Sequence, residues 1–352
     1  MGNKELLEKI WNLENVKRPA VIVEESIGYE PANANTSIHI EDYEVQYQNA
    51  IAYYDSLRKD RDDNVPALNT AMGTFVIPTV FGAAIRSFGD GRRYIDKSII
   101  LEAQDIDKLK PIPLLDSILG HQIKLVEYFQ HRIGGSIPIR IPDLQNPLGV
   151  AAMLWETTSF YTSLVDEPER VHRLLSIITE VIIECVNKLK EACPNVVPVS
   201  WPWIWAPTEK GIHLSDDTMS MVSPDMYEEY GVHYNNIISR EFGGVFLHSC
   251  TTNKRYFNSI IKNKGLRSIN FAAQYSSEMK EIYEFFGGKV VILPHYVHTD
   301  NPQIGTLPEF VEKVLDCWTP KSPTIIYVSA KPEGGLQQEV FNVLEARGFS
   351  IK

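Results

Sequence analysis

Cysteine, positive charge and long apolar runs are all scarce in this sequence of 352 residues. Only four cysteines occur, at positions 185, 193, 250 and 317, so we expect reduced thiols and a cytoplasmic location rather than a disulfide framework. The net charge of −11 argues against a broad surface for nucleic acid or anionic membranes. No apolar run reaches the roughly 18 residues that a bilayer-spanning helix needs.

Common ligand-binding and targeting motifs are also missing. The sequence contains no P-loop, no glycine-rich dinucleotide turn and no nucleophile elbow. Its first residues, MGNKELLEKI, lack the basic-then-apolar order of a secretory signal.

The sequence does contain an alternation of short β-rich runs and helical periodicities. The β-rich runs begin at residues 20, 75, 136, 195, 211, 243, 267, 289 and 324. Between most of them, apolar residues recur every three or four positions, as they do in residues 166–192. Alternating strands and helices build parallel sheets with right-handed crossovers. About eight such units in this length predict an α/β fold, a (β/α)8 TIM barrel. We expect one domain over residues 1–352, in which residues 1–70 form a helical N-terminal extension around one early strand.

One β-rich run, FGGVFLHSC, ends with a histidine and a cysteine, His248 and Cys250. Alternate side chains of an extended chain point to the same face, so this pair would share a face. The active sites of barrels lie at the C-terminal ends of the strands, where the pair falls. An imidazole and a thiolate are good zinc ligands, but zinc takes four donors, and the same pair also fits an ordinary core. His295 ends a later strand and is a better-placed third ligand than Cys317, which follows an outer helical pattern.

Two other strand ends carry candidate functional residues. Asp216 and Asp217 directly follow the apolar run GIHLS, and we predict a catalytic role for them, since carboxylates there can orient a cation or bind a proton. The alternative is helix capping. Trp201, Trp203 and Trp205 alternate in SWPWIW, and they could wall a pocket for an aromatic ring or an alkylammonium group, or form a packed core layer.

Further substrate-binding candidates lie in polar loops after other strands. Asn146 belongs to the loop IPDLQNPLG, which leads to a helical stretch carrying Glu156, and Tyr296 lies beside His295. The last such loop, VSAKPEGG, offers Lys331 and Glu333. Its two glycines precede a helix, where open backbone amides can bind an anion, but the pattern is only a weak signal for such a site.

Several of these stretches resemble the uroporphyrinogen decarboxylase superfamily, which also contains cobalamin-dependent methyltransferases, such as those that methylate coenzyme M. The resemblance runs from about Pro138 to Phe349 and rests on IRIPDLQNPLGVAAML, FGGVFLHSC and AKPEGGLQQEVFNVLEA, in order and at fitting distances. It implies a (β/α)8 barrel. The arginine-bearing segment of the decarboxylases is missing, because Arg18 stands alone, and so is the histidine of their last strand-end loop.

The methyltransferase branch fits better. Its members bind zinc with a His-x-Cys pair, which His248 and Cys250 match, and with a distant cysteine that is absent around residues 329–331. The resemblance therefore implies a third ligand from Glu333, His295 or Asp217. It further implies a methyl group moved between a corrinoid and a small acceptor such as a thiol. No DxHxxG corrinoid segment occurs, so the corrinoid would be carried by a partner protein. A decarboxylase-like lyase and a non-enzymatic barrel that binds a small ligand are the two alternatives.

Overall fold

The structure is a computed structural model that describes residues 3–24, 42–58, 62–70, 73–87, 93–297, 305–329 and 335–350. The strands are β1 Ala20–Glu24, β2 Leu68–Asn69, β3 Ile85–Ser87, β4 Arg93–Ile95, β5 Ile139–Arg140, β6 Ile212–Ser215, β7 Val245–His248, β8 Leu266–Ala272, β9 Val291–Val297 and β10 Ile325–Ser329. The α-helices are α1 Asn3–Trp11, α2 Tyr43–Leu57, α3 Val76–Thr79, α4 Ile118–Ile133, α5 Pro147–Leu154, α6 Thr157–Asp166, α7 Pro168–Ala192, α8 Pro224–Tyr227, α9 His233–Phe242, α10 Phe257–Ile260, α11 Met279–Phe286, α12 Leu307–Cys317 and α13 Leu336–Ala346.

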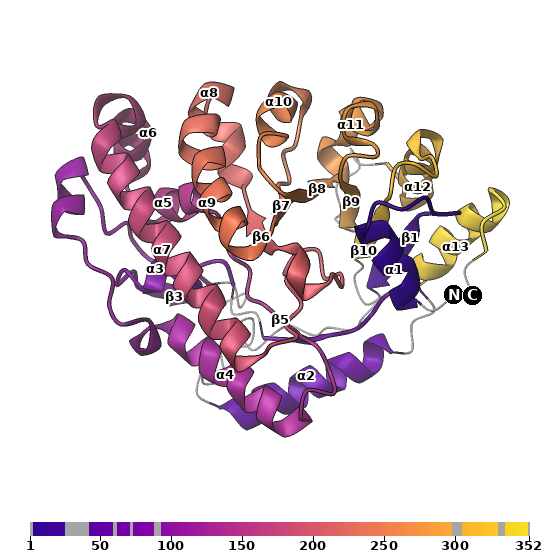
Figure 1. The fold of residues 1–352 in the computed structure, drawn as a ribbon, viewed down its shortest axis with the longest axis horizontal. Helices are drawn as coiled ribbons and strands as arrows, with labels where there is room; N and C mark the ends of the chain where they lie inside the picture. Colours follow the sequence, from indigo (N-terminus) through magenta and orange to yellow (C-terminus); the bar gives the residue numbers. More distant parts are fainter. Residues whose placement is uncertain are drawn as a thin grey trace.

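Parallel strands form a barrel wall with helices outside it (Figure 1). Six strands make one sheet in the order β1-β10-β9-β8-β7-β6. Short pairings continue the wall. A bridge joins Gln145 to Ser215 of β6, β5 pairs with β2, and the Asp63 N–H donates to Val21 O (2.9 Å) back at β1. Eight strands thus contribute to the wall: β1, β2, β5 and β6 to β10. The predicted (β/α)8 barrel is confirmed.

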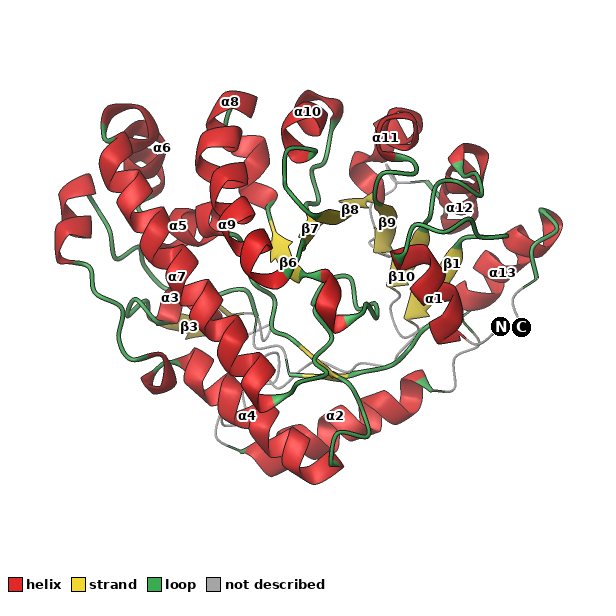
Figure 2. Ribbon diagram, in the orientation of Figure 1, coloured by secondary structure: helices red, strands yellow, loops and turns green. Residues whose placement is uncertain are grey.

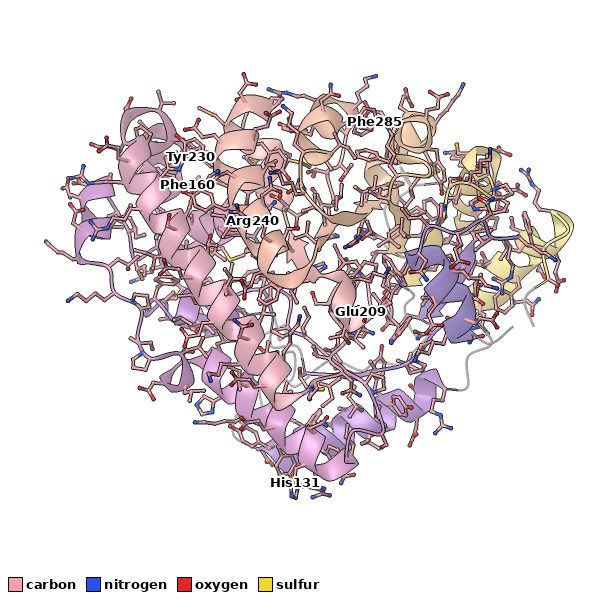
Figure 3. All side chains as sticks on the ribbon, in the orientation of Figure 1. His131, Phe160, Glu209, Tyr230, Arg240 and Phe285 are labelled. Atoms are coloured by element: carbon pink, nitrogen blue, oxygen red, sulfur yellow. The ribbon has the colours of Figure 1, made fainter. Side chains whose placement is uncertain are left out.

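The two faces of the wall carry different side chains. Outward residues such as Val21, Leu247 and Ile326 belong to a core shared with the helices, which Figure 2 shows in red outside the yellow strands. Tyr230, labelled in Figure 3, lies in the turn before α9 and donates to Leu164 O of α6 (2.8 Å). Because strand side chains alternate, the other set of residues fills the interior.

The N-terminal helix α1 closes the start of the barrel. Its apolar stripe, which includes Leu7 and Ile10, packs into the interior core. Trp11 meets Phe246 of β7 edge-on with ring centroids 5.1 Å apart, and its Nε1 donates to Trp205 O (2.9 Å). The apolar half of the barrel is therefore plugged, and the opposite half, at the C-terminal strand ends, is the end that can hold a site.

Two expected strands are not strands. The run from residue 75 forms the short helix α3 and turns, because Pro78 cannot donate a ladder hydrogen bond. The run from residue 195 forms no regular strand: Val197 bridges to Arg140 and Pro198 O accepts from His213 N (2.9 Å). Pro198 and Pro202 interrupt it, and the Trp201–Pro202 peptide is cis. The second strand of the wall is instead β2, whose two residues are too few for a sequence pattern to show.

The helices predicted later in the chain form where expected. Ser223 caps α8 through a hydrogen bond from Met226 N (3.2 Å), with Pro224 at the first helical position. A π-helical turn, Glu228–Val232, joins α8 to α9. No helix in the described ranges is both long and apolar enough to cross a membrane.

Candidate metal centre and active site

The C-terminal ends of β6 and β7 bring three candidate ligands together. Asp217, His248 and Cys250 each offer one ligand atom, and these atoms all lie within 4.8 Å of one another. His248 Nε2 is 3.5 Å from Cys250 Sγ and 3.9 Å from Asp217 Oδ2. The second Asp217 oxygen accepts a hydrogen bond from Cys250 N (2.7 Å), which fixes the carboxylate against the β7 turn. We call this group the triad.

The neighbouring strand orients the histidine of the triad. The register pairs His248 of β7 with Asn270 of β8, and His248 Nδ1 is hydrogen-bonded to Asn270 Oδ1. The Asn270 amide in turn donates from Nδ2 to Leu293 O (2.5 Å), so its oxygen faces the imidazole as an acceptor. His248 therefore carries its proton on Nδ1, and the Nε2 lone pair points toward Asp217 and Cys250. Metal-bound histidines have this arrangement, with the second nitrogen held by an acceptor.

Electrostatics at the triad favour a cation. Burial, reinforced by the charge of Asp217, raises the pKa of the Cys250 thiol to about 12. A second negative charge beside the Asp217 carboxylate is unfavourable unless a positive charge balances it. Two anionic donors and one imidazole are a donor set that zinc accepts, and three protein ligands are the number that catalytic zinc sites use, with a fourth position left for water or substrate. The residues present therefore fit the ion.

Two more histidines lie beside the triad inside the barrel. The His213 ring stacks on His248 at 6.2 Å, and its Nε2 lies 2.9 Å from Ser215 Oγ and 3.5 Å from Asp143. The His295 ring is 5.7 Å from His248 on the other side. Burial, together with the charge of His248, lowers the pKa of His295 to about 3, so it is neutral. It lies next to the triad but outside the group of three.

Asp216 and Asp217 have different surroundings although they are adjacent. Asp216 is fully buried, and its Oδ2 accepts from Tyr227 Oη (2.7 Å) and Asn235 Nδ2 (3.2 Å). Burial raises its pKa to about 7. Asn146 joins this buried network through Asn235 (3.3 Å) and caps α5 at Gly149 N (2.8 Å). Only Asp217 of the pair is at the mouth.

The tryptophans separate into two places. Trp201 and Trp203 are neighbours, 6.3 Å apart and nearly perpendicular, and Trp201 lies 6.1 Å from the His295 ring. Trp205 instead packs toward α1, where Lys4 lies over its ring at 5.2 Å. The expected shared face of all three required an extended chain, which the proline-containing segment does not keep.

The other predicted residues lie away from the triad. Glu156 caps α6, accepting from Thr158 N (3.1 Å) and Ser159 N (2.8 Å). Tyr296 faces the helix layer, with its ring 5.5 Å from Phe310 of α12. Cys317 ends α12 on the outside of the barrel, beside Tyr283 and Lys280. Glu333 lies outside the described residues, as do His298 and Lys331.

Three buried or half-buried residues that the sequence did not single out belong to the site. Asn270 holds His248, while Arg140 and Glu24 lie inside the barrel near Trp201. Each occupies an inward position at or near the C-terminal end of its strand. A polar residue near the end of a β-rich run was the available signal, but it can be interpreted only once the register of the strands is known.

Comparison with known proteins agrees with this architecture. The sequence matches the family described as uroporphyrinogen decarboxylase (URO-D) over residues 61–292. The structure is similar to that of a methyltransferase from Methanosarcina mazei, with a TM-score of 0.70 and 14% sequence identity over 99% of both chains. At that identity the likeness shows the fold. No curated protein matches the sequence.

Proposed function

The chain belongs to the uroporphyrinogen decarboxylase family, and on that premise we propose that it is a zinc-assisted methyltransferase. It would move a methyl group between a corrinoid, carried by a separate partner protein, and a small acceptor such as a thiol. The triad carries this proposal, because Asp217, His248 and Cys250 fit zinc at the barrel mouth. The methyltransferase from Methanosarcina mazei with the same fold supports it.

The triad and the neighbouring Asn270 have defined roles in this reaction. Asn270 keeps the His248 Nε2 lone pair directed at the mouth, and Asp217 and Cys250 supply the two anionic donors. A bound zinc ion would supply the positive charge that lowers the pKa of an acceptor thiol. The sulfur of that acceptor would take the methyl group from the corrinoid. The electron pair of the broken cobalt–carbon bond would stay with the corrinoid, and the thiol proton would pass to solvent.

Metal content tests the proposal directly. Purified protein should hold about one zinc per chain, the stoichiometry of a three-ligand catalytic site. His248→Ala and Cys250→Ala should lose it. Cys317→Ala is the matched control, since Cys317 is also a partly buried free cysteine but lies on the outside of the barrel, and it should keep the metal.

Activity provides the second measurement. Methylated corrinoid protein or free methylcobalamin, incubated with a thiol, should lose its methyl–cobalt absorbance with wild type and Cys317→Ala but not with His248→Ala. Zinc-free wild type, or zinc retained by both triad variants, would contradict the proposal. Ligand binding without metal or methyl transfer would instead favour a non-enzymatic barrel.

A further inference from the structure

Four aromatic side chains and one carboxylate form a closed ring beside the triad. Tyr53 of α2 meets Trp203 at 5.6 Å between ring centroids, and Trp203 meets Trp201 at 6.3 Å. Trp201 then meets Tyr327 of β10 at 5.6 Å. Glu24, at the end of β1, completes the circuit, because one of its oxygens accepts from Tyr53 Oη and the other from Tyr327 Oη. We call these five residues the aromatic ring site.

The arrangement has the geometry of a box. Neighbouring ring planes are inclined at 79°, 84° and 75°, so consecutive aromatic walls are close to perpendicular. The tyrosines are buried, whereas Trp201, Trp203 and Glu24 are only partly buried. A ligand that approached from the barrel mouth would therefore meet two indoles and a carboxylate.

The loop that carries the two indoles is held from below by Arg140. Its Nη1 donates to Val199 O (2.7 Å) and Ile204 O (2.6 Å), the carbonyls on either side of the Trp201–Trp203 segment. Arg140 is buried, and burial lowers its pKa to about 10, while the charge of Glu24 acts in the opposite direction. The positions of both indoles are thus set by an internal clamp rather than by surface packing.

We infer that the aromatic ring site binds a methylated ammonium group. Aromatic faces attract cations that are too alkylated to hydrogen-bond, and a carboxylate within the box balances the charge. The contact from Trp201 to His295 (6.1 Å), and from His295 to His248 (5.7 Å), places the site one ring away from the triad. This inference deepens the proposed function, on which it rests for the role of the ligand as the cationic end of the methyl acceptor.

Choline and two analogues of the same shape test the inference on the full-length protein. Isothermal titration calorimetry should show choline binding about tenfold or more tightly than its uncharged carbon analogue tert-butylethanol. The carboxylate tert-butylacetate should bind no better than tert-butylethanol. Equal affinity for choline and tert-butylethanol would reduce the site to an apolar patch, and a preference for tert-butylacetate would make Arg140 the ligand-binding group; either result, or the absence of choline binding, overturns the inference.

Variants then locate the binding. Trp203→Leu and the isosteric Glu24→Gln should each weaken choline binding about tenfold. Trp318→Leu is the matched control, since Trp318 packs on Phe349 elsewhere (5.5 Å), and it should bind choline as wild type does. Thermal unfolding verifies that each variant is folded. Unchanged affinity in folded Trp203→Leu and Glu24→Gln would refute the site.

His248→Ala separates this inference from the proposed function. It should lose zinc and keep choline affinity, because the aromatic ring site does not use the triad. If wild type lacks zinc but choline binding follows the variants as above, the proposed function fails and the binding site remains. If zinc and methyl transfer are present but choline does not bind, only the inference fails.

Discussion

Replacing Asn270 with alanine should weaken metal binding without touching a ligand atom. The change removes the acceptor of His248 Nδ1 and leaves the imidazole free to rotate or to change its tautomer. Loss of such an outer partner typically lowers metal affinity about 10–100-fold, or about 1.4–2.7 kcal/mol. The variant should also lose stability, since Leu293 O loses its donor in a buried setting.

A chelator competition assay measures the effect as the zinc dissociation constant of each variant. Asn270→Asp should keep most of the affinity, because a carboxylate also accepts from Nδ1. Asn263→Ala provides a control for the loss of a buried asparagine: Asn263 is as buried as Asn270 and likewise donates to a carbonyl, Ile260 O, at 2.9 Å. It should leave zinc affinity unchanged. Wild-type affinity in Asn270→Ala would refute the assigned tautomer and the role of Nε2 as the ligand atom.

Two further changes test the barrel itself through urea unfolding. Arg140→Met leaves Val199 O and Ile204 O without their side-chain donor, and it should lower the free energy of unfolding by about 1–3 kcal/mol for each. A loss under 1 kcal/mol would contradict the role of Arg140 in fixing this loop. Gly244→Ala should lower the free energy of unfolding by about 1–3 kcal/mol more than Gly82→Ala does. The new Cβ at position 244 would lie 2.5 Å from Lys210 O, whereas no atom lies within 4 Å of a Cβ at position 82. Equal losses of stability would show that the backbone around Gly244 can shift to make room for a methyl group.

The sequence predicts the strands of this barrel where local pattern and tertiary role agree. Runs such as GGVFLHSC are β-branched or aromatic, are bounded by glycine, and became β7 and its neighbours. The run from residue 75 has the same apolar content, but Pro78 removes a ladder donor, and the segment packs as α3 and turns instead. Apolar content alone does not separate a strand from a buried helical turn.

Some residues of the candidate site can likewise be predicted from local sequence pattern, whereas others depend on the tertiary structure. The positions of His248 and Cys250 follow from the two-residue period of β7, and that of Asp217 from its place just after the neighbouring strand β6. The contributions of Asn270, Glu24 and Arg140 depend on which strands are neighbours and in which register, and these are long-range properties. For the same reason, the sequence could not distinguish the buried Asp216 from the half-buried Asp217.

The inward face of the barrel changes from apolar to polar within a single step along several strands. Phe246 packs against the plug helix α1, and His248, two residues on, belongs to the triad. Leu293 and His295 repeat this step in β9. Buried polar atoms normally find partners, yet His295 Nδ1 and Ser200 Oγ have no hydrogen-bond partner among the described residues. Such groups lower stability, so their presence beside the triad and the aromatic ring site is expected of a surface shaped for a ligand rather than for packing.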